Sequence, residues 1–171
     1  AVTGVQTCAL PIWLLGSNYR SIITDSYSSG IVKGDKYVGG LAGYNELAFI
    51  INSYNTGSVN GDQYVAGLIG ANNRSTVRNS YNKGSVNGNL KVGGLVGENE
   101  NSSIRESFST GSVGGSDQYV GGLVGYLRDQ STVSNSYSSG SVSGGGHYVG
   151  GLLGYTEHST ISNSYSNGSL S

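Results

Sequence analysis

The sequence predicts an all-β protein, a parallel β-solenoid (β-helix) of about five to six stacked coils of about 27 residues, with three short strands per coil. A block of the form Val-Gly-Gly-Leu-Val-Gly at 92–97 recurs at 38–43, 65–70, 120–125 and 149–154, so that its leucines are 27, 27, 28 and 29 residues apart. A second block, serine followed by an aromatic residue, keeps the same period at Tyr27, Tyr54, Tyr81, Phe108, Tyr137 and Tyr165. Self-similarity at a fixed period of this length is the signature of a repeat architecture.

Composition narrows the class of protein. The 171 residues include 30 glycines and 13 tyrosines, one proline and only 11% charged residues, with a net charge of −1. Such a chain has no basic surface for nucleic acid, and it has no run of about 18 apolar residues that would cross a membrane. The single cysteine, Cys8, has no second cysteine with which to form a disulfide within the chain. We therefore expect no nucleic-acid partner and no membrane span in this sequence.

Residues 1–13 do not follow the repeat, and they hold the only cysteine, proline and tryptophan. No basic segment precedes their apolar part, as it would in a signal peptide. The string at 2–12 looks like the in-frame translation of a common sequencing-library adapter, and the repeat pattern begins directly after the leader. We therefore interpret 1–13 as a non-native leader and 14–171 as a single β-solenoid repeat array, a fragment of a longer protein.

The repeat unit is clearest at 75–101. In chain order it contains a strand at 75–81, a glycine bend at 84, a strand at 85–86, a second bend at 88, a strand at 91–97 and a polar corner at 98–101. The strand segments are rich in β-branched and aromatic residues, which favour strands. A helical repeat of similar period is excluded by the glycine content, and a propeller blade needs about 40 residues.

Comparison of the copies shows which positions stay constant. The first bend is always glycine, at Gly30, Gly57, Gly84, Gly111, Gly140 and Gly168. The position four before the aromatic residue is always Ile or Val, at Ile23, Ile50, Val77, Ile104, Val133 and Ile161. The position two after the bend is also apolar, at Val32, Val59, Val86, Val113, Val142 and Leu170. An unchanging glycine either needs a positive φ or has no room for a Cβ.

In stacked coils, equivalent side chains form ladders with a spacing of about 4.8 Å. We expect the Ile/Val and Val/Leu ladders to fill a thin core, and the aromatic residues from Tyr27 to Tyr165 to stack ring on ring. An amide ladder is expected at Asn52, Asn79, Asn135 and Asn163, and it should be partly wet because Asp25 and Glu106 interrupt it.

The block at 92–97 leaves one question open. In a regular strand Val92 and Leu95 point to opposite faces. Either the glycine pair forms a bulge that resets the alternation, or one face carries an exposed apolar stripe.

The Gly-Leu-Val-Gly block, together with the Asn-Ser-Tyr-x-x-Gly-Ser-Val segment at 79–86, resembles the GLUG-motif repeat over about 14–171. Ala42 and Ala66 depart mildly from the motif, and Ala71 and Glu98 replace the tyrosine that follows the block elsewhere. The family occurs in bacterial cell-surface and secreted proteins, including adhesin-like proteins and some immunoglobulin-A-cleaving metallopeptidases. The resemblance implies a β-rich surface module and carries over no catalytic residue, because the motif itself is structural.

No pattern for a catalytic, cofactor or metal site is found. A His-Glu-x-x-His zinc motif is missing, and His147 and His158 belong to different corners. Asp35, Asp62 and Asp117 faintly resemble the acids of calcium-binding repeat loops, but the nonapeptide pattern is missing. An ice-binding array would need threonine throughout the column of Thr76, Thr132 and Thr160, where other copies carry Ile22, Phe49 and Ser103.

Two classes of function remain. The first is a structural or adhesive surface module, a stalk or display scaffold without catalysis of its own, located extracellularly or on a bacterial cell surface. The second is a carbohydrate-binding or carbohydrate-active β-helix, or the non-catalytic repeat region of a secreted metallopeptidase. A glycosidase needs paired carboxylates, whereas the acids here are scattered. Expected partners are the neighbouring repeats, a host or cell-surface protein or glycan, and other copies that associate through open solenoid ends.

Overall fold

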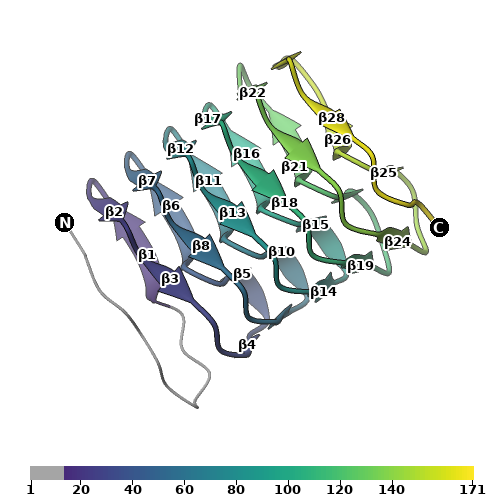
Figure 1. The fold of residues 1–171 in the computed structure, drawn as a ribbon, viewed down its shortest axis with the longest axis horizontal. Helices are drawn as coiled ribbons and strands as arrows, with labels where there is room; N and C mark the ends of the chain where they lie inside the picture. The colour runs from purple at the N-terminus through teal and green to yellow at the C-terminus, as the bar shows by residue number, and fades with distance from the viewer. Residues whose placement is uncertain (1–13) are drawn as a thin grey trace.

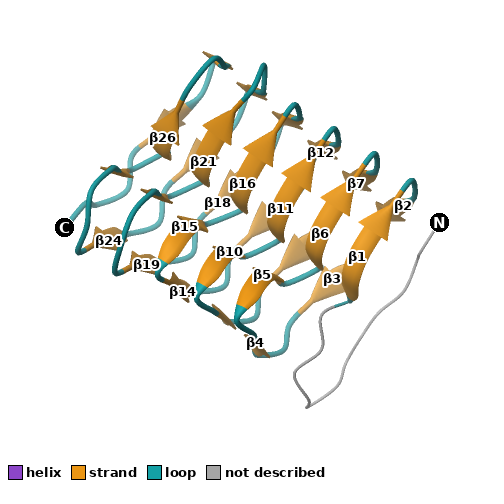
Figure 2. Cartoon of the chain, turned by 180° about the vertical axis from the view of Figure 1, so that it is seen from behind, coloured by secondary structure: helices purple, strands orange, loops and turns teal. Residues whose placement is uncertain are grey.

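The computed structural model describes residues 14–171, which form strands and turns only; no helix long and apolar enough to cross a membrane occurs among them. The strands make five parallel sheets, and the chain winds through all five in each coil. Figures 1 and 2 show the coils side by side along one axis, with the first described coil and the C-terminus at opposite ends. The predicted parallel β-solenoid of about six coils is confirmed, while the interpretation of 1–13 as a leader lies outside the described residues.

Three of the sheets contain one strand from each of six coils. Sheet I contains β1 (Leu15–Tyr19), β6 (Ala42–Glu46), β11 (Ile69–Asn73), β16 (Val96–Glu100), β21 (Val124–Arg128) and β26 (Leu153–Thr156). Sheet II contains β2 (Ile22–Thr24), β7 (Phe49–Ile51), β12 (Thr76–Arg78), β17 (Ser103–Arg105), β22 (Thr132–Ser134) and β27 (Thr160–Ser162). Sheet III contains β3 (Tyr27–Ser28), β8 (Tyr54–Asn55), β13 (Tyr81–Asn82), β18 (Phe108–Ser109), β23 (Tyr137–Ser138) and β28 (Tyr165–Ser166).

The other two sheets contain five strands each. Sheet IV contains β4 (Val32–Lys33), β9 (Val59–Asn60), β14 (Val86–Gly88), β19 (Val113–Gly115) and β24 (Val142–Gly144). Sheet V contains β5 (Lys36–Gly39), β10 (Gln63–Ala66), β15 (Leu90–Gly93), β20 (Val120–Gly121) and β25 (Val149–Gly150). The sixth copy reaches sheet IV through a single bridge between Val142 and Leu170.

The three predicted strand segments are present in every complete coil, and two of them are bent. In the middle coil, Asn79 adopts φ 48° and separates β12 from β13. The glycine-pair block likewise divides into β15 and β16. Three segments therefore supply five sheets.

The bend in the glycine-pair block answers the question of alternation. Val92 and Leu95 are both 0% exposed, so neither forms an exposed stripe. They face two separate apolar clusters: the larger contains the Ile, Leu and Val side chains of sheets I and II, and the smaller contains only the valines of sheets IV and V. The break in the strand lets one short block contribute to both clusters.

Between the two clusters the interior is narrow and polar. Asn55 donates a hydrogen bond from Nδ2 to Oδ1 of Asn82 at 2.8 Å, and both side chains are buried. A Cβ on Gly67 would lie 2.1 Å from Cγ of Asn82, which explains why the glycine pair faces this column. In two later coils the column carries Ser109 and Ser138, whose Oγ atoms have no hydrogen-bond partner within 14–171.

A second buried amide column runs through sheet I. Nδ2 of Asn18, Asn45 and Asn72 each donates to Oδ1 of the asparagine in the next coil at 2.7 Å, ending at Asn99. Leu127 takes the same place one coil later, and Nδ2 of Asn99 turns to the carbonyl oxygen of Ser102. The column satisfies buried polar groups between coils, as burial requires.

The invariant bend glycine is explained by contact between coils. A Cβ on Gly84 would lie 1.8 Å from the carbonyl oxygen of Gly57 in the preceding coil, and no described glycine has a positive φ. Of the two expectations for this position, the lack of room for a side chain is therefore correct.

Candidate interaction face

The outward side of sheet II changes in character from coil to coil, and we call it the sheet II face. Its first column, at the start of each strand, contains Ile22, Phe49, Thr76, Ser103, Thr132 and Thr160. Its second column, at the end of each strand, contains Thr24, Ile51, Arg78, Arg105, Ser134 and Ser162. The residue between the two columns points inward and is always Ile or Val.

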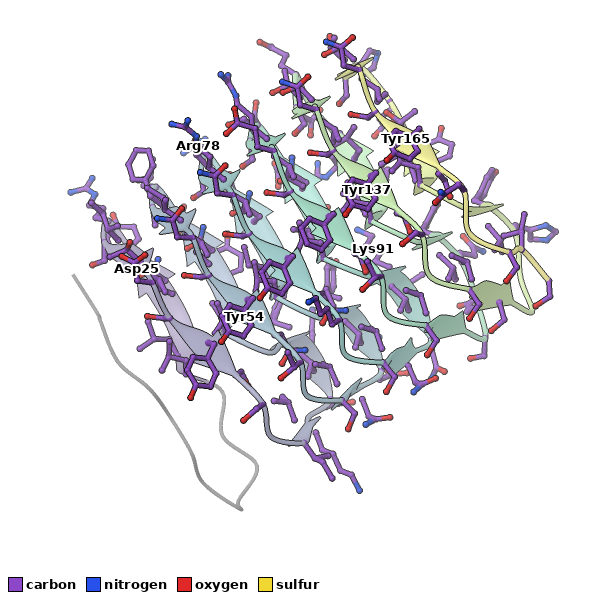
Figure 3. All side chains as sticks on the ribbon, in the orientation of Figure 1. Asp25, Tyr54, Arg78, Lys91, Tyr137 and Tyr165 are labelled. Carbon is purple, nitrogen blue, oxygen red and sulfur yellow. The ribbon has the colours of Figure 1, made fainter. Side chains whose placement is uncertain are left out.

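The face changes in character along the axis. In the second coil the outward side chains of this face are apolar, and Phe49 is 46% and Leu47 37% exposed. The next two coils carry arginines in the second column, and Figure 3 shows Arg78 pointing away from the stack. The last two coils carry only threonine and serine in both columns.

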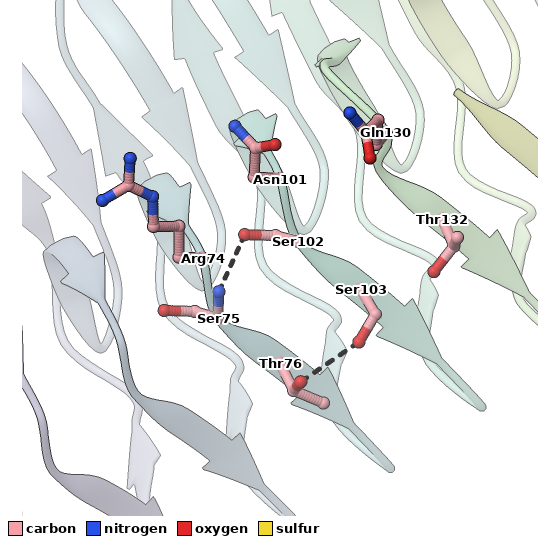
Figure 4. A pocket seen from close by; sticks show the side chains of 8 residues that line it. All are labelled: Arg74, Ser75, Thr76, Asn101, Ser102, Ser103, Gln130 and Thr132. Atoms are coloured by element: carbon pink, nitrogen blue, oxygen red, sulfur yellow. Dashed lines mark hydrogen bonds between the residues drawn. The ribbon is translucent and has the colours of Figure 1, made fainter. Parts of the chain in front are cut away.

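An open groove of about 530 Å³ crosses the middle of this face. Its walls come from three neighbouring strands and the turn after the third, and they contain Phe49, Ile51, Thr76, Arg78, Ser103, Arg105 and Glu106. We call it the Phe49–Arg105 groove. A smaller hollow of about 250 Å³ adjoins it between Arg74, Asn101 and Gln130 (Figure 4). The two hollows share Thr76 and Ser103, whose hydroxyl oxygens lie 3.1 Å apart.

Positive charge concentrates here. Every arginine of the chain except Arg128 lies on this face or at its corner. Arg78 pairs with Glu106, Nε to Oε2, at 3.0 Å, and both side chains are about half exposed (55% and 46%). Among residues 14–171, Arg74 and Arg105 form no ion pair. The groove therefore has an excess of cationic donors over carboxylates.

The aromatic ladder on sheet III has a different geometry. Consecutive rings from Tyr27 to Tyr165 are stacked, with centroids 4.8 to 5.4 Å apart and planes within 8° of parallel. Figure 3 shows Tyr54, Tyr137 and Tyr165 along one line parallel to the axis. The expected ring-on-ring ladder is confirmed. Because each inner ring has a neighbour on both faces, the ladder presents ring edges rather than flat faces on which a sugar could stack.

The GLUG-motif family model matches four segments of the chain, at 34–60, 88–114, 116–143 and 145–171, which together are more than half of it. The chain belongs to the GLUG-motif family. The copy at 61–87, which the family model does not match, contains Ala66 in place of a glycine. It nevertheless forms β10 to β14 in register with its neighbours.

A solved structure of a candidate immunoglobulin A1 protease from Bacteroides ovatus is similar to this GLUG array, with a TM-score of 0.65 and 18% sequence identity. The match covers 88% of this chain and 59% of that chain, so the array spans less than two thirds of the other protein's length. At this identity the likeness shows the fold alone. No curated protein matches the chain in sequence.

The GLUG array has a second aromatic cluster, the aromatic corner, where sheets V and I meet. One column contains Tyr37, Tyr64, Lys91, Tyr119 and Tyr148, all with positive φ. The other contains Tyr44, Ala71, Glu98, Tyr126 and Tyr155.

The middle of the aromatic corner holds an ion-pair network. Lys91 Nζ lies 4.6 Å and 4.7 Å from the ring centroids of Tyr64 and Tyr126. It also lies 3.0 Å from Oε2 of Glu98, whose other oxygen accepts a 2.6 Å hydrogen bond from Nε of Arg128. The Glu98 side chain is only 7% exposed. Glu98, which departs from the motif's tyrosine, is thus neutralised by two cations within the corner.

Burial and charge shift two pKa values in this corner. Burial raises the pKa of Tyr126 above its ordinary value, and the hydrogen bond that its hydroxyl donates to Glu157 raises it further. Burial lowers the pKa of Arg128, but the hydrogen bond to Glu98 and the charges of Glu98, Glu100 and Asp129 outweigh burial and leave it raised. Both shifts favour the protonated forms that make these contacts. The contacts of the aromatic corner therefore hold neighbouring coils together.

The aspartates and threonines that were candidates for metal or ice binding lie at equivalent places in successive coils. Asp62 accepts a hydrogen bond from Asn89, which takes its place in the next coil. Within 14–171 no group of three or more His, Cys, Asp or Glu side chains is arranged to hold a metal ion. Thr76 shares its column with Phe49 and Ser103, so the threonines do not form a continuous array.

The amide ladder expected at Asn52, Asn79 and their equivalents is exposed and weak. Asn79 donates to Asn52 at 3.4 Å, and Asn52 to Asp25 at 3.2 Å. All these positions have positive φ, which Asn and Asp tolerate better than most residues. Their main role is therefore the turn between sheets II and III. The buried column at Asn18, Asn45, Asn72 and Asn99 was not predicted from the sequence.

Proposed function

We propose that residues 14–171 form a non-catalytic structural and adhesive module on an extracellular or cell-surface protein. In this proposal the stack is a rigid scaffold, and the sheet II face is the surface that meets a partner. One observation carries it: in sheet II the inward residue is Ile or Val in all six coils, while the outward residues on either side of it range from apolar to cationic to hydroxyl.

The acidic residues support a structural role. Glu98 and Glu100 both hold Arg128, Glu106 holds Arg78, and Glu157 accepts from Tyr126. These contacts join different coils, so four of the ten acidic residues take part in structural contacts. The edge-on geometry of the aromatic ladder favours a scaffold over a sugar-binding platform for sheet III.

The likeness to a candidate immunoglobulin A1 protease is compatible with a second reading of the same module. A repeat array that matches 59% of such a chain would serve there as a non-catalytic region beside a peptidase. This reading keeps the scaffold role and changes only the neighbouring domain.

The test is adhesion under flow of beads coated with the chain, on immobilised extracellular-matrix proteins, mucin and bacterial cell-wall preparations. The key variant replaces Phe49, Ile51, Arg78 and Arg105 with threonine or serine, the residues that later coils carry in the same columns. A matched control replaces Lys33 with asparagine, which the next coil carries at that position on sheet IV.

We expect adhesion to at least one surface, lost in the key variant and kept in the control. Beads that adhere nowhere would overturn the adhesive role. Release of peptide or sugar fragments by the purified chain would overturn the non-catalytic role.

A further inference from the structure

We propose that the Phe49–Arg105 groove binds an extended acidic segment of another protein, one that places an apolar side chain beside its carboxylates. This inference rests on the proposed adhesive function and names the partner class for the same face.

The apolar end of the groove is the first observation. Phe49 is 46% exposed and stands next to Leu47, itself 37% exposed, and Ile51 in one coil. Neighbouring exposed apolar side chains mark contact surfaces more often than single ones do. No other coil of the sheet II face has three apolar residues at these positions.

The charge of the groove is the second observation. Arg78 and Arg105 follow directly in the second column, and Arg74 flanks the first column. Glu106, which also lines the groove, pairs with Arg78. In the described part of the chain Arg105 is left without an ion pair, and Arg74 adds a further charge in the adjoining hollow, so the groove keeps a net positive charge in a chain whose net charge is −1. A guanidinium group binds carboxylates through paired hydrogen bonds, so a ligand rich in Glu or Asp complements this surface.

The middle of the groove can hydrogen-bond to a peptide. Thr76 and Ser103 follow Phe49 in the first column, on the same strands as Arg78 and Arg105, and their hydroxyls can meet backbone amides and carbonyls.

These features favour a peptide over an anionic glycan. The apolar wall of Phe49 and Ile51 offers no hydrogen-bonding group to sugar hydroxyls, and leaving those groups unpaired is unfavourable. An aliphatic or aromatic side chain would be buried there without that penalty. A polyanionic glycan is therefore the alternative that the experiment must separate.

The experiment measures binding of the full chain to labelled probes by fluorescence anisotropy, and maps the contact by amide chemical shifts. The probes are an eight-residue peptide that alternates Glu with Leu, the same peptide with Gln in place of Glu, and a sulfated glycosaminoglycan. The variants are Phe49→Thr, which matches Thr76, and Arg105→Ser, which matches Ser134. Lys33→Asn is the control for loss of one positive charge elsewhere.

We expect the Glu–Leu peptide to bind and the Gln–Leu peptide to bind much more weakly. Each groove variant should weaken binding about tenfold, in the range found for residues at the centre of an interface. The control should leave binding unchanged, and added salt should weaken it because exposed charges are screened. Shift changes should map to β7, β12 and β17.

Three outcomes would overturn the inference: no binding of the acidic peptide, binding that ignores Phe49→Thr, or binding of the glycan alone. The adhesion assay separates this failure from failure of the proposed function. If beads adhere and the key variant does not, but the peptide fails to bind, the adhesive function stands and the peptide assignment falls. If the peptide binds and the beads adhere nowhere, the peptide assignment stands and the adhesive function falls.

Discussion

The two sides of sheet II follow opposite rules. On the inner side, Val77 and its equivalents are Ile or Val in every coil and are fully buried in all but the last. On the outer side, the neighbouring Thr76 and Arg78 change from coil to coil. A strand of three residues thus serves the fold with one side chain and the surface with two. The comparison implies that stability depends on the positions that repeat, and that recognition depends on those that do not.

Replacing the bend glycine should have the largest effect. In Gly84→Val, the new Cβ would collide with the carbonyl oxygen of Gly57, 1.8 Å away, so the two coils must separate. We expect a loss of at least about 5 kcal/mol in the free energy of unfolding, beyond the range of ordinary substitutions. Hydrogen exchange should show lost protection in the coils on both sides, because stacked repeats stabilise their neighbours. Protection equal to the parent chain would contradict the stacked-coil account.

Val86→Asp should come next. Val86 is 0% exposed in the valine cluster, and the chain has no cation there to pair with a carboxylate. An uncompensated buried charge costs about 3 to 5 kcal/mol. Urea unfolding followed by circular dichroism would measure the loss, and the loss should shrink at low pH, where the new carboxyl is neutral. A loss that does not change with pH would mean that packing, rather than charge, dominates.

Substitutions in the aromatic corner should have effects of intermediate size, because only some coils carry tyrosine at its positions. Glu98→Gln leaves Lys91 and Arg128 without their shared, 7% exposed carboxylate, and we expect a loss of about 2 kcal/mol. Glu100→Gln is the matched control, because among residues 14–171 the Glu100 carboxylate pairs with Arg128 alone, and its side chain is 27% exposed. The control should cost under about 1 kcal/mol, as exposed pairs do. Equal losses in thermal or urea unfolding would show that burial does not decide the strength of this network.

The raised pKa of Tyr126 predicts a smaller, pH-dependent effect. A tyrosine whose pKa is raised by folding stabilises the folded state fully below the unfolded pKa of about 10, and this contribution is lost as pH rises through the folded pKa. Stability should therefore fall above pH 10, and it should fall less steeply in Tyr126→Phe. Urea unfolding at pH 8 and pH 11 for both chains would measure the difference. Parallel pH dependence would exclude Tyr126 as the source.

Outward positions should show the smallest effects. Phe49→Thr and Lys83→Ala change exposed residues at places where other coils carry different types. We expect each to alter the free energy of unfolding by less than about 0.5 kcal/mol, as measured by urea unfolding. A large loss at either position would break the distinction between the repeating and the varying side.

The sequence predicted what depends on periodicity. The constant Ile, Val and glycine positions and the aromatic ladder from Tyr27 to Tyr165 were visible because each recurs at the same place in every copy. In a stacked fold, the same place in sequence means the same place in space.

The sequence did not predict features set by local geometry. Whether Asn99 points inward depends on where β16 begins after the bend, and asparagine is more often exposed than buried. In the next coil Leu127 takes the place of Asn99, so asparagine does not recur at this position in every copy. The charged groove was not predicted for a different reason. Arg78 and Arg105 share a column, but the other coils carry different residues there, and a repeat reveals only the positions that stay constant.

The in-register stacking has a consequence for the length of any partner. Coils repeat about every 4.8 Å along the axis, whereas side chains on one side of an extended peptide repeat about every 6.8 Å. A peptide lying along the axis therefore falls out of step with the columns after two or three coils, however long the solenoid is. Each contact would stay short and weak, and a tight hold on a surface would have to come from many such contacts made at once by neighbouring molecules.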